Sequence, residues 1–544
     1  MAALSNELPT IEPRVVERES RLVVLDEASN ELVFAVVGHA GSGTSVVATQ
    51  LSNLLTETRI GDQAFEVEIL KAREVIAAWA AKKGLPLPPS TTPPSLSQVE
   101  KLQDYGDQIR AELTSTGEPD HAAIARALVL KIRSLRASKV GLSAQGHDPI
   151  PPDGKRRAYI LDSIRHPAEV QLLRHVYKEA FVLLGVVCEE EKRISRIGSK
   201  YRDAGRRAAL EFMRRDADAL ERYGQHVADA FHLSDYYVDN TVDRLKDGES
   251  NPDWDVIERL SRLVKILTHA ELVRPTVAET AMHHAYSAQM QSACLSRQVG
   301  AAVVDIHGNV VATGTNEVPR GGGGVYGESF DPERHDARCA MFGDSRERYC
   351  RNTRQQKEII DDLLMRIAEL RDVPAERKPT LVAELRNTRI GGLLEFSRAV
   401  HAEMDALLSA ARKGVSLTGT RLFTTTFPCH YCARHIVAAG VDEVQYIEPY
   451  PKSQALNLHK DAIAVEHTGW TPPSRGGEKV LFRPFSGVAP QLYKRAFMKD
   501  RELKDGHTGE MQIKSPDWGT PWHLPRVSYV QIEAELSKEA TANG

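Results

Sequence analysis

The pattern of apolar positions divides the chain into two regions that mix helix and strand. In the first region, the apolar run Leu32–Val37 ends at a glycine-rich turn, and helical spacing follows over Val46–Leu55; this predicts a strand, a loop and a helix. Further strands are predicted at Ala158–Leu161 and Ala180–Cys188. A strand, a glycine loop and a helix in this order are typical of the start of a nucleotide-binding α/β domain.

Two helical stretches, Trp254–Leu267 and Val277–Ser292, lead into the second region. There the apolar runs Val299–Asp305 and Val310–Gly314 flank a His-Gly-Asn turn, which predicts a hairpin. A charged insert follows at 320–396. The chain then continues as helix, strand, helix and strand over Arg398–Lys413, Arg421–Thr425, Cys429–Ala439 and Glu443–Ile447. The sequence therefore predicts an α/β fold in both regions.

Composition is that of a globular protein with more than one domain. The 544 residues are too many for a single core, and 42% hydrophobic and 26% charged residues are ordinary values. The formal charge of -4 argues against a protein that coats nucleic acid. No apolar run is long enough to cross a membrane, and no signal-peptide pattern is present. Six cysteines in so long a chain indicate free thiols or metal ligands rather than a disulfide framework. We expect a cytoplasmic protein without a membrane partner.

The strongest chemical signal joins a histidine to two cysteines. His401 is followed two positions later by Glu403, and Cys429 and Cys432 form a Cys-x-x-Cys pair where the next helix is predicted to begin. Zinc favours a tetrahedral set of imidazole and thiolate ligands, and a catalytic site keeps one position for water. The pattern therefore favours a catalytic Zn²⁺ site over its alternatives, a structural zinc knuckle or two buried thiols.

Glu403 and the two helix starts would complete the chemistry of this site. We expect Glu403 to reach the zinc water without binding the metal, which makes it the predicted general acid and base. Pro428 suits the opening turn of the helix that carries the cysteines, and Gly440 suits its end. A helix N-terminus would favour the thiolate form of both cysteines.

The stretch 274–453 resembles the deoxycytidylate deaminase branch of the cytidine deaminase superfamily. The matching segments are Ser296–Ala301, Gly314–Gly321, His401–Met404, Pro428–Cys432 and Glu448–Pro451. The resemblance implies a cytidine-deaminase-like, three-layer α/β/α domain that hydrolyses free cytosine deoxynucleotides to uracil deoxynucleotides.

The same resemblance implies a set of substrate contacts. Asn316 would hydrogen-bond the sugar or the base edge, and Arg297 would lie near a phosphate. Ala402 and Pro428 would complete the substrate-binding set. By composition alone, Asn316 would instead be a turn residue in a loop rich in glycine and proline.

The charged insert departs from short members of this family. His335, Cys339 and Cys350 could form a second, structural zinc site, as some deoxycytidylate deaminases use. Their spacing is irregular, and solvated loop thiols are the alternative.

A glycine loop in the first region follows the phosphate-binding pattern with one departure. Its residues are Gly38, Gly41, Ser42, Gly43, Thr44 and Ser45. Thr44 stands where lysine belongs, whereas Ser45 could still contact Mg²⁺, and Asp162 resembles the acidic residue of nucleotide kinases. The backbone amides could hold the phosphates of ATP, GTP or a deoxynucleotide. Without the lysine we expect nucleotide sensing rather than phosphoryl transfer, with a chance glycine loop as the alternative.

The pairing of a kinase-like P-loop domain with this deaminase domain resembles bacterial antiviral deoxycytidylate deaminases of the AvcD type. That resemblance implies deamination of dCTP and dCMP, depletion of cytosine deoxynucleotides during phage infection, and restraint by a small RNA. The resemblance to the deoxycytidylate deaminase branch implies a homo-oligomer such as a hexamer. The alternatives are a deaminase of single-stranded DNA or RNA, a housekeeping dCMP deaminase that supplies dUMP, and a P-loop regulatory protein with an inactive site. We hypothesise that a nucleotide at the loop, or an RNA partner, switches the deaminase between two states.

The sequence thus predicts five segments along the chain. They are a mobile lead-in at 1–30, a P-loop nucleotide-kinase-like domain at 31–245, a helical linker at 246–275, a deaminase domain at 276–500 and a C-terminal arm at 501–544.

Overall fold

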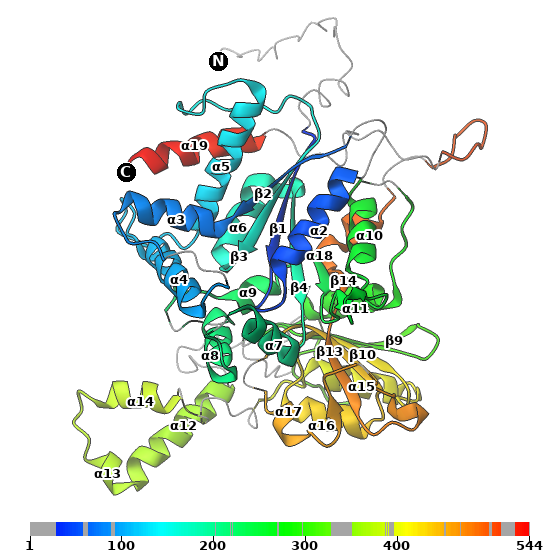
Figure 1. The fold of residues 1–544 in the computed structure, drawn as a ribbon. Coiled ribbons are helices and arrows are strands. Elements are labelled where there is room, and N and C mark those ends of the chain that lie inside the picture. Colours follow the sequence, from blue (N-terminus) through cyan, green and yellow to red (C-terminus); the bar gives the residue numbers. More distant parts are fainter. Residues whose placement is uncertain are drawn as a thin grey trace, which may run out of the picture.

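Two six-stranded sheets carry the fold (Figure 1). The computed structural model describes residues 29–57, 64–88, 93–201, 203–217, 219, 221–268, 271–295, 297–327, 351–386, 388, 390, 397–450, 453–467, 469–499, 503–512 and 528–542. Over these ranges, no helix is both long and apolar enough to span a membrane. Strands and helices alternate in both halves of the chain, and this confirms the predicted α/β class.

The first sheet has the strand order β14-β5-β4-β1-β3-β2. Its parallel strands are β1 (Glu31–Val37), β2 (Glu66–Lys71), β3 (Arg157–Ile164), β4 (Phe181–Val187) and β5 (Tyr236–Asp239). Every residue of β1 and β4 is buried, as expected for central strands that are covered on both faces. All strands predicted in this region are confirmed, whereas β2 was not predicted.

Helices cover both faces of this sheet. On one face lie α2 (Thr44–Glu57), α10 (Val256–Thr268) and α18 (Pro490–Phe497). The helices of the other face are α3 (Ala72–Lys82), α4 (Leu96–Ala111), α5 (Ala123–Val140), α6 (Pro167–Tyr177), α9 (Val227–Phe231) and α19 (Ser528–Ala542). Two more helices, α7 (Glu190–Lys200) and α8 (Arg206–Ala217), pack on each other near the glycine loop (Figure 1). A small ribbon of β6 (Leu245–Lys246) and β7 (Glu249–Ser250) precedes α10.

The second sheet has the order β12-β13-β11-β10-β8-β9. Its strands are β8 (Gly300–Val304), β9 (Val310–Thr315), β10 (Arg421–Thr426), β11 (Glu443–Glu448), β12 (Ile463–Ala464) and β13 (Val480–Pro484). One face packs on α11 (Val277–Gln289), and the other on α15 (Ala402–Arg412) and α16 (His430–Ala438), with the short α17 (Ala455–Leu458) beside α16. The antiparallel pairing of β8 with β9 confirms the predicted hairpin, and the layers confirm the predicted α/β/α arrangement.

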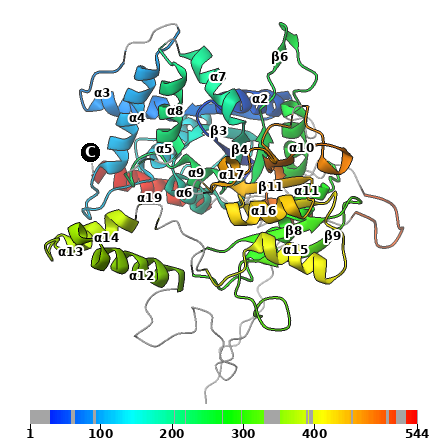
Figure 2. The same ribbon diagram turned by 90° about the horizontal axis from the view of Figure 1, so that it is seen from below.

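The insert contributes helices that contact one another beside the body of the molecule (Figure 2). They are α12 (Arg351–Arg366), α13 (Ala368–Arg371) and α14 (Lys378–Arg386). His335, Cys339 and Cys350, the residues of the predicted second zinc site, lie outside the described residues.

One short segment belongs to both sheets. After β13, the chain crosses at Phe485 and forms β14 (Gly487–Val488), which pairs antiparallel with β5 in the first sheet. Gly487 has φ +118°, and a Cβ there would lie 2.7 Å from Oε1 of Glu279, so only glycine fits without strain. The division at residues 245, 275 and 500 stays a prediction, but the chain beyond Phe485 packs against the first sheet and against α11, the helix that covers one face of the second sheet.

The C-terminal helix α19 is attached by a buried ionic cluster. Arg136 of α5 contacts Glu31 at 2.7 Å and Glu533 of α19 at 2.6 Å, and none of these side chains is more than 2% exposed. The hydroxyl groups of Tyr177 and Tyr529 donate to Glu533 and Glu31 at 2.7 and 2.8 Å. Because each charge is paired and hydrogen-bonded, the burial cost of the cluster is largely offset.

Substituting Glu533→Ala should therefore destabilise the protein. The change removes one partner of a buried guanidinium, and we expect a loss of about 3 kcal/mol in the free energy of unfolding. Urea unfolding monitored by circular dichroism measures it, and hydrogen exchange of α19 shows where the structure opens. Glu535→Ala is the matched control, because Glu535 lies on the same helix but is largely exposed. Equal stability of the two variants would contradict the importance of the cluster.

Candidate metal centre

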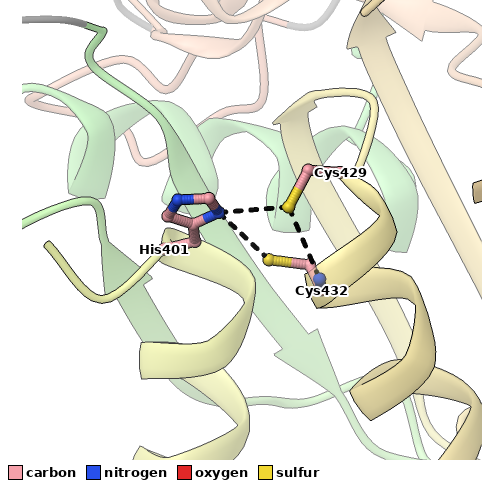
Figure 3. A group of neighbouring side chains, drawn as sticks. All are labelled: His401, Cys429 and Cys432. Carbon is pink, nitrogen blue, oxygen red and sulfur yellow. Dashed lines mark hydrogen bonds between the residues drawn. The ribbon is translucent and has the colours of Figure 1, made fainter. Parts of the chain in front are cut away.

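His401 and Cys429 each lie just before a helix begins. His401 is the N-cap of α15 and Cys429 is the N-cap of α16, both with extended backbone. The two helices pack against each other on the second sheet, so that their first turns meet. Nδ1 of His401 lies 3.2 Å from Sγ of Cys429 and 3.4 Å from Sγ of Cys432 (Figure 3). The structure thus brings the three predicted ligands together.

The cluster has the chemistry of a zinc site. The ligand atoms of His401, Cys429 and Cys432 all lie within 4.8 Å of one another, and both cysteines are buried. Among the described residues, no other group of His, Cys, Asp or Glu side chains meets the same criterion. Two thiolates and an imidazole are ligands that zinc prefers, and a set of three leaves a position for water. The residues present therefore fit the metal that the sequence predicts.

The hydrogen bond between the two thiols concentrates negative charge on Cys429. Donation from Cys432 lowers the pKa of Cys429 to about 4, and the contact with His401 lowers it further against the effect of burial. The same hydrogen bond and burial raise the pKa of Cys432. Burial alone would lower the pKa of His401, but its hydrogen bond to Cys429 and the charge of that thiolate raise it overall. The negative charge of the cluster is therefore centred on Cys429, and a thiolate is the form of cysteine that binds zinc.

Glu403 lies in the first turn of α15, directly beside the ligands. Its side chain is buried, and Sγ of Cys432 lies 3.4 Å from its Oε2. Burial raises the pKa of Glu403 to about 7, with a further contribution from the charge of Cys429. A carboxyl group with a pKa near neutrality can both accept and release a proton.

Asn316 is linked to the cluster through its neighbour in the chain, and it has one unused acceptor. Its neighbour Glu317 exchanges two backbone hydrogen bonds with Val400, the residue before His401, at 3.2 and 2.9 Å. Nδ2 of Asn316 donates to the carbonyl of Arg297 at 2.7 Å, whereas its buried Oδ1 has no hydrogen-bond partner. A buried acceptor without a partner is costly unless a ligand supplies a donor.

The remaining predicted substrate contacts lie around the same cluster. The side chain of Arg297 contacts Glu448 at 3.0 Å, next to the ring of Tyr450. Ala402 is fully buried at the start of α15. Pro428 lies outside α16, which begins after Cys429, so it precedes the helix instead of opening its first turn.

Two carboxylates that the sequence analysis did not single out hold this region together. Oδ2 of Asp405 accepts the backbone N–H of Thr315 at 3.1 Å. Glu317 accepts the N–H groups of Ala293 and Val318 at 2.9 and 2.7 Å. Both carboxylates position the strand end that leads to Asn316. The available signal for Asp405 was its spacing, since a charged residue four positions after His401 falls on the buried face of the helix.

The glycine loop lies at the other sheet, between β1 and α2 (Figure 1). Oγ of Ser45 donates to Oδ2 of Asp162 at 2.7 Å, so the structure brings these two predicted residues together. Gly41 and Gly43 have φ of +84° and +87°, values that glycine adopts without strain. Thr44, which stands in place of lysine, begins α2.

Comparison with known proteins agrees with the geometry of the cluster. Residues 275–448 match a family model described as the cytidine and deoxycytidylate deaminase zinc-binding region. The deoxycytidylate deaminase of Enterobacteria phage T2 is 26% identical over 189 residues, which cover 32% of this chain and 82% of the phage protein. A probable deoxycytidylate deaminase of Drosophila melanogaster is 40% identical over 80 residues, 14% of this chain and 38% of the fly protein.

Among solved structures, the dCMP deaminase from the cyanophage S-TIM5 in complex with dCMP and dUMP is 21% identical, with a TM-score of 0.22. The match covers 39% of this chain and 99% of the cyanophage chain. Together, the family match and the curated relatives place a domain of the cytidine and deoxycytidylate deaminase class in the C-terminal part of the chain, and the protein is a hydrolytic deaminase.

Proposed function

We propose that the protein deaminates free cytosine deoxynucleotides, dCMP and dCTP, to the corresponding uracil nucleotides. The observation that carries the proposal is the buried carboxylate of Glu403 beside the cluster of His401, Cys429 and Cys432. This arrangement lies within the segment that matches the deaminase zinc-binding region. The curated relatives are deoxycytidylate deaminases, which supports cytosine nucleotides as the substrate class.

Each residue of the site has a role in the proposed reaction. His401, Cys429 and Cys432 would hold Zn²⁺, which when bound supplies the Lewis acidity that activates a water molecule at neutral pH. Glu403 would accept one proton from the attacking water at its carboxylate and deliver it to the ring nitrogen N3, and would then carry the second proton, from the hydroxyl group added at C4, to the amine that leaves as ammonia. Its pKa of about 7 suits both directions of transfer.

Polar groups at the rim would orient the substrate. Oδ1 of Asn316 is free to accept a hydrogen bond from a sugar hydroxyl or from the base edge. The guanidinium of Arg297 is partly exposed and can donate to a phosphate. Ala402 and Pro428 flank the ligand residues and would form part of the wall of the pocket.

The glycine loop supports a second, regulatory proposal. The loop Gly38–Ser45 would hold the phosphates of a nucleotide, with Ser45 and Asp162 near its Mg²⁺, and would sense it without transferring phosphate. The conformation of the loop and the contact between Ser45 and Asp162 support this role. The resemblance to the antiviral deaminases supports a biological role in depleting cytosine deoxynucleotides during phage infection, as a cytoplasmic homo-oligomer restrained by a small RNA.

Replacing the proton carrier should stop the reaction without removing the metal. Glu403→Gln keeps the size of the side chain but cannot take a proton, and we expect kcat for dCMP to fall on the order of a hundredfold to ten-thousandfold. Metal analysis of the same sample should show zinc at the wild-type level. Near-normal turnover would rule out Glu403 as the general acid and base.

Removing a metal ligand should abolish zinc binding as well as activity. Cys429→Ala should lose both zinc and activity, because two ligands hold the ion far less tightly than three. Cys188→Ala is the matched control, since Cys188 is a partly buried free thiol outside the cluster. Full zinc occupancy in the Cys429 variant would refute the ligand set.

Phosphate should matter for substrate choice. Zinc-loaded protein should show a kcat/KM for dCMP and dCTP about tenfold or more above that for deoxycytidine, because charge-assisted hydrogen bonds to phosphate are strong. Uracil formation from these three compounds and from single-stranded DNA tests the proposed function directly. If uracil formed only in single-stranded DNA, the substrate would be a polynucleotide and not a free nucleotide.

A further inference from the structure

Arg297, the side chain proposed to meet the substrate phosphate, is already engaged by a carboxylate. Its Nη2 lies 3.0 Å from Oε1 of Glu448, and its guanidinium lies 5.4 Å from the centre of the Tyr450 ring. The side chains of Arg297 and Glu448 are 43% and 27% exposed, so the pair faces solvent at the rim of the site. A guanidinium has five N–H donors, which leaves some of them for a second anion.

Glu448 is held in place from two sides. It ends β11, and its Oε2 accepts the hydroxyl of Thr426 at 3.0 Å. Its carbonyl accepts the N–H of Phe427 at 2.7 Å. Thr426 and Phe427 lead directly into the turn that carries Cys429. The carboxylate therefore has a defined position relative to both Arg297 and the metal ligands.

The fixed carboxylate changes how the rim responds to substrate charge. A phosphate that approaches Arg297 is attracted by the guanidinium and repelled by Glu448 at the same time. The repulsion grows with each further negative charge on the substrate, so a triphosphate is affected more than a monophosphate. An uncharged nucleoside is affected by neither.

We propose that Glu448 is a positioning and specificity-determining residue that orients Arg297 and favours the cytosine deoxynucleotide with fewer phosphate charges. The inference rests on the proposed function, which names the substrate class, and adds how the site distinguishes dCMP from dCTP. Glu448 acts through Arg297 and takes no part in the chemistry at the zinc ligands.

The test is Glu448→Gln in the full-length, zinc-loaded protein. Glutamine keeps the shape of the side chain and an acceptor for Thr426, while the negative charge is removed. We expect KM to fall about fivefold for dCTP and about twofold for dCMP, with the smallest change for deoxycytidine, as befits a charge interaction at a partly exposed site. The effect should fall on KM more than on kcat, and it should shrink as the salt concentration rises.

Glu443→Gln is the matched control. Glu443 begins the same strand and contacts Arg483 at 3.7 Å, away from the rim, and its substitution changes the net charge of the protein by the same amount. We expect this variant to leave the ratio of the KM values for dCTP and dCMP at the wild-type value. A shift equal to that of the Glu448 variant would overturn the inference, because only overall charge would then matter.

A second variant keeps the inference testable if Glu448→Gln does not fold. Arg297→Gln leaves Glu448 without its partner, so KM should rise most for dCTP, less for dCMP and least for deoxycytidine. A uniform change across the three substrates in either variant would overturn the role of Glu448. Either result leaves the proposed function standing, which fails only if the wild-type protein deaminates none of the free substrates.

Discussion

The meeting of four ionisable side chains at one point, three of them buried and one partly buried, constrains the second sheet and the helices that cover it. Two thiols, an imidazole and a carboxylate meet beneath the starts of α15 and α16, and burying such groups is costly unless partners compensate their charge. The N-termini of both helices provide a favourable dipole for negative charge, and at α16 the backbone N–H of Cys432 donates to Sγ of Cys429. The parallel register of β10 with β11, in which Thr426 lies opposite Glu448, sets where α16 begins and therefore where Cys429 is held. The strands thus determine the geometry of a site to which they contribute no ligand.

The ligands of this site were predictable because they lie on two short segments. His401 with Glu403 and Cys429 with Cys432 are each separated by a few residues, so local spacing and helix-start patterns were sufficient to identify them. The predicted helix over Arg398–Lys413 begins four residues later in the structure, at Ala402, because Val400, two residues before it, is paired with Glu317 in an isolated bridge. That pairing joins residues that are distant in the sequence, and no local pattern contains it.

Features that depend on distant contacts were not predictable for the same reason. The strand β14 has two residues and forms only because β5 offers it an edge. The segment expected to be a polar C-terminal arm includes α19, whose Tyr529 and Glu533 are buried against Arg136. The roles of Asp405 and Glu317 were not predicted, because both carboxylates act by accepting hydrogen bonds from backbone N–H groups of residues that are distant in the sequence. The glycine loop was recognised from its spacing, whereas its ligand and the domain boundaries stay predictions.

The crossing at Phe485 limits how the two sheets can influence each other. The ring of Phe485 lies 6.1 Å from that of Tyr237 on β5, and β13, just before it, pairs with β11, the strand that ends at Glu448. A displacement of β5 relative to the second sheet would therefore strain a link of two residues between β13 and β14. The described contacts include one further connection near the glycine loop, between Glu189 at the start of α7 and His467 at 3.6 Å. A nucleotide at the glycine loop that alters the deaminase must act on such connections, because a ligand shifts an equilibrium only through contacts that differ between the two states.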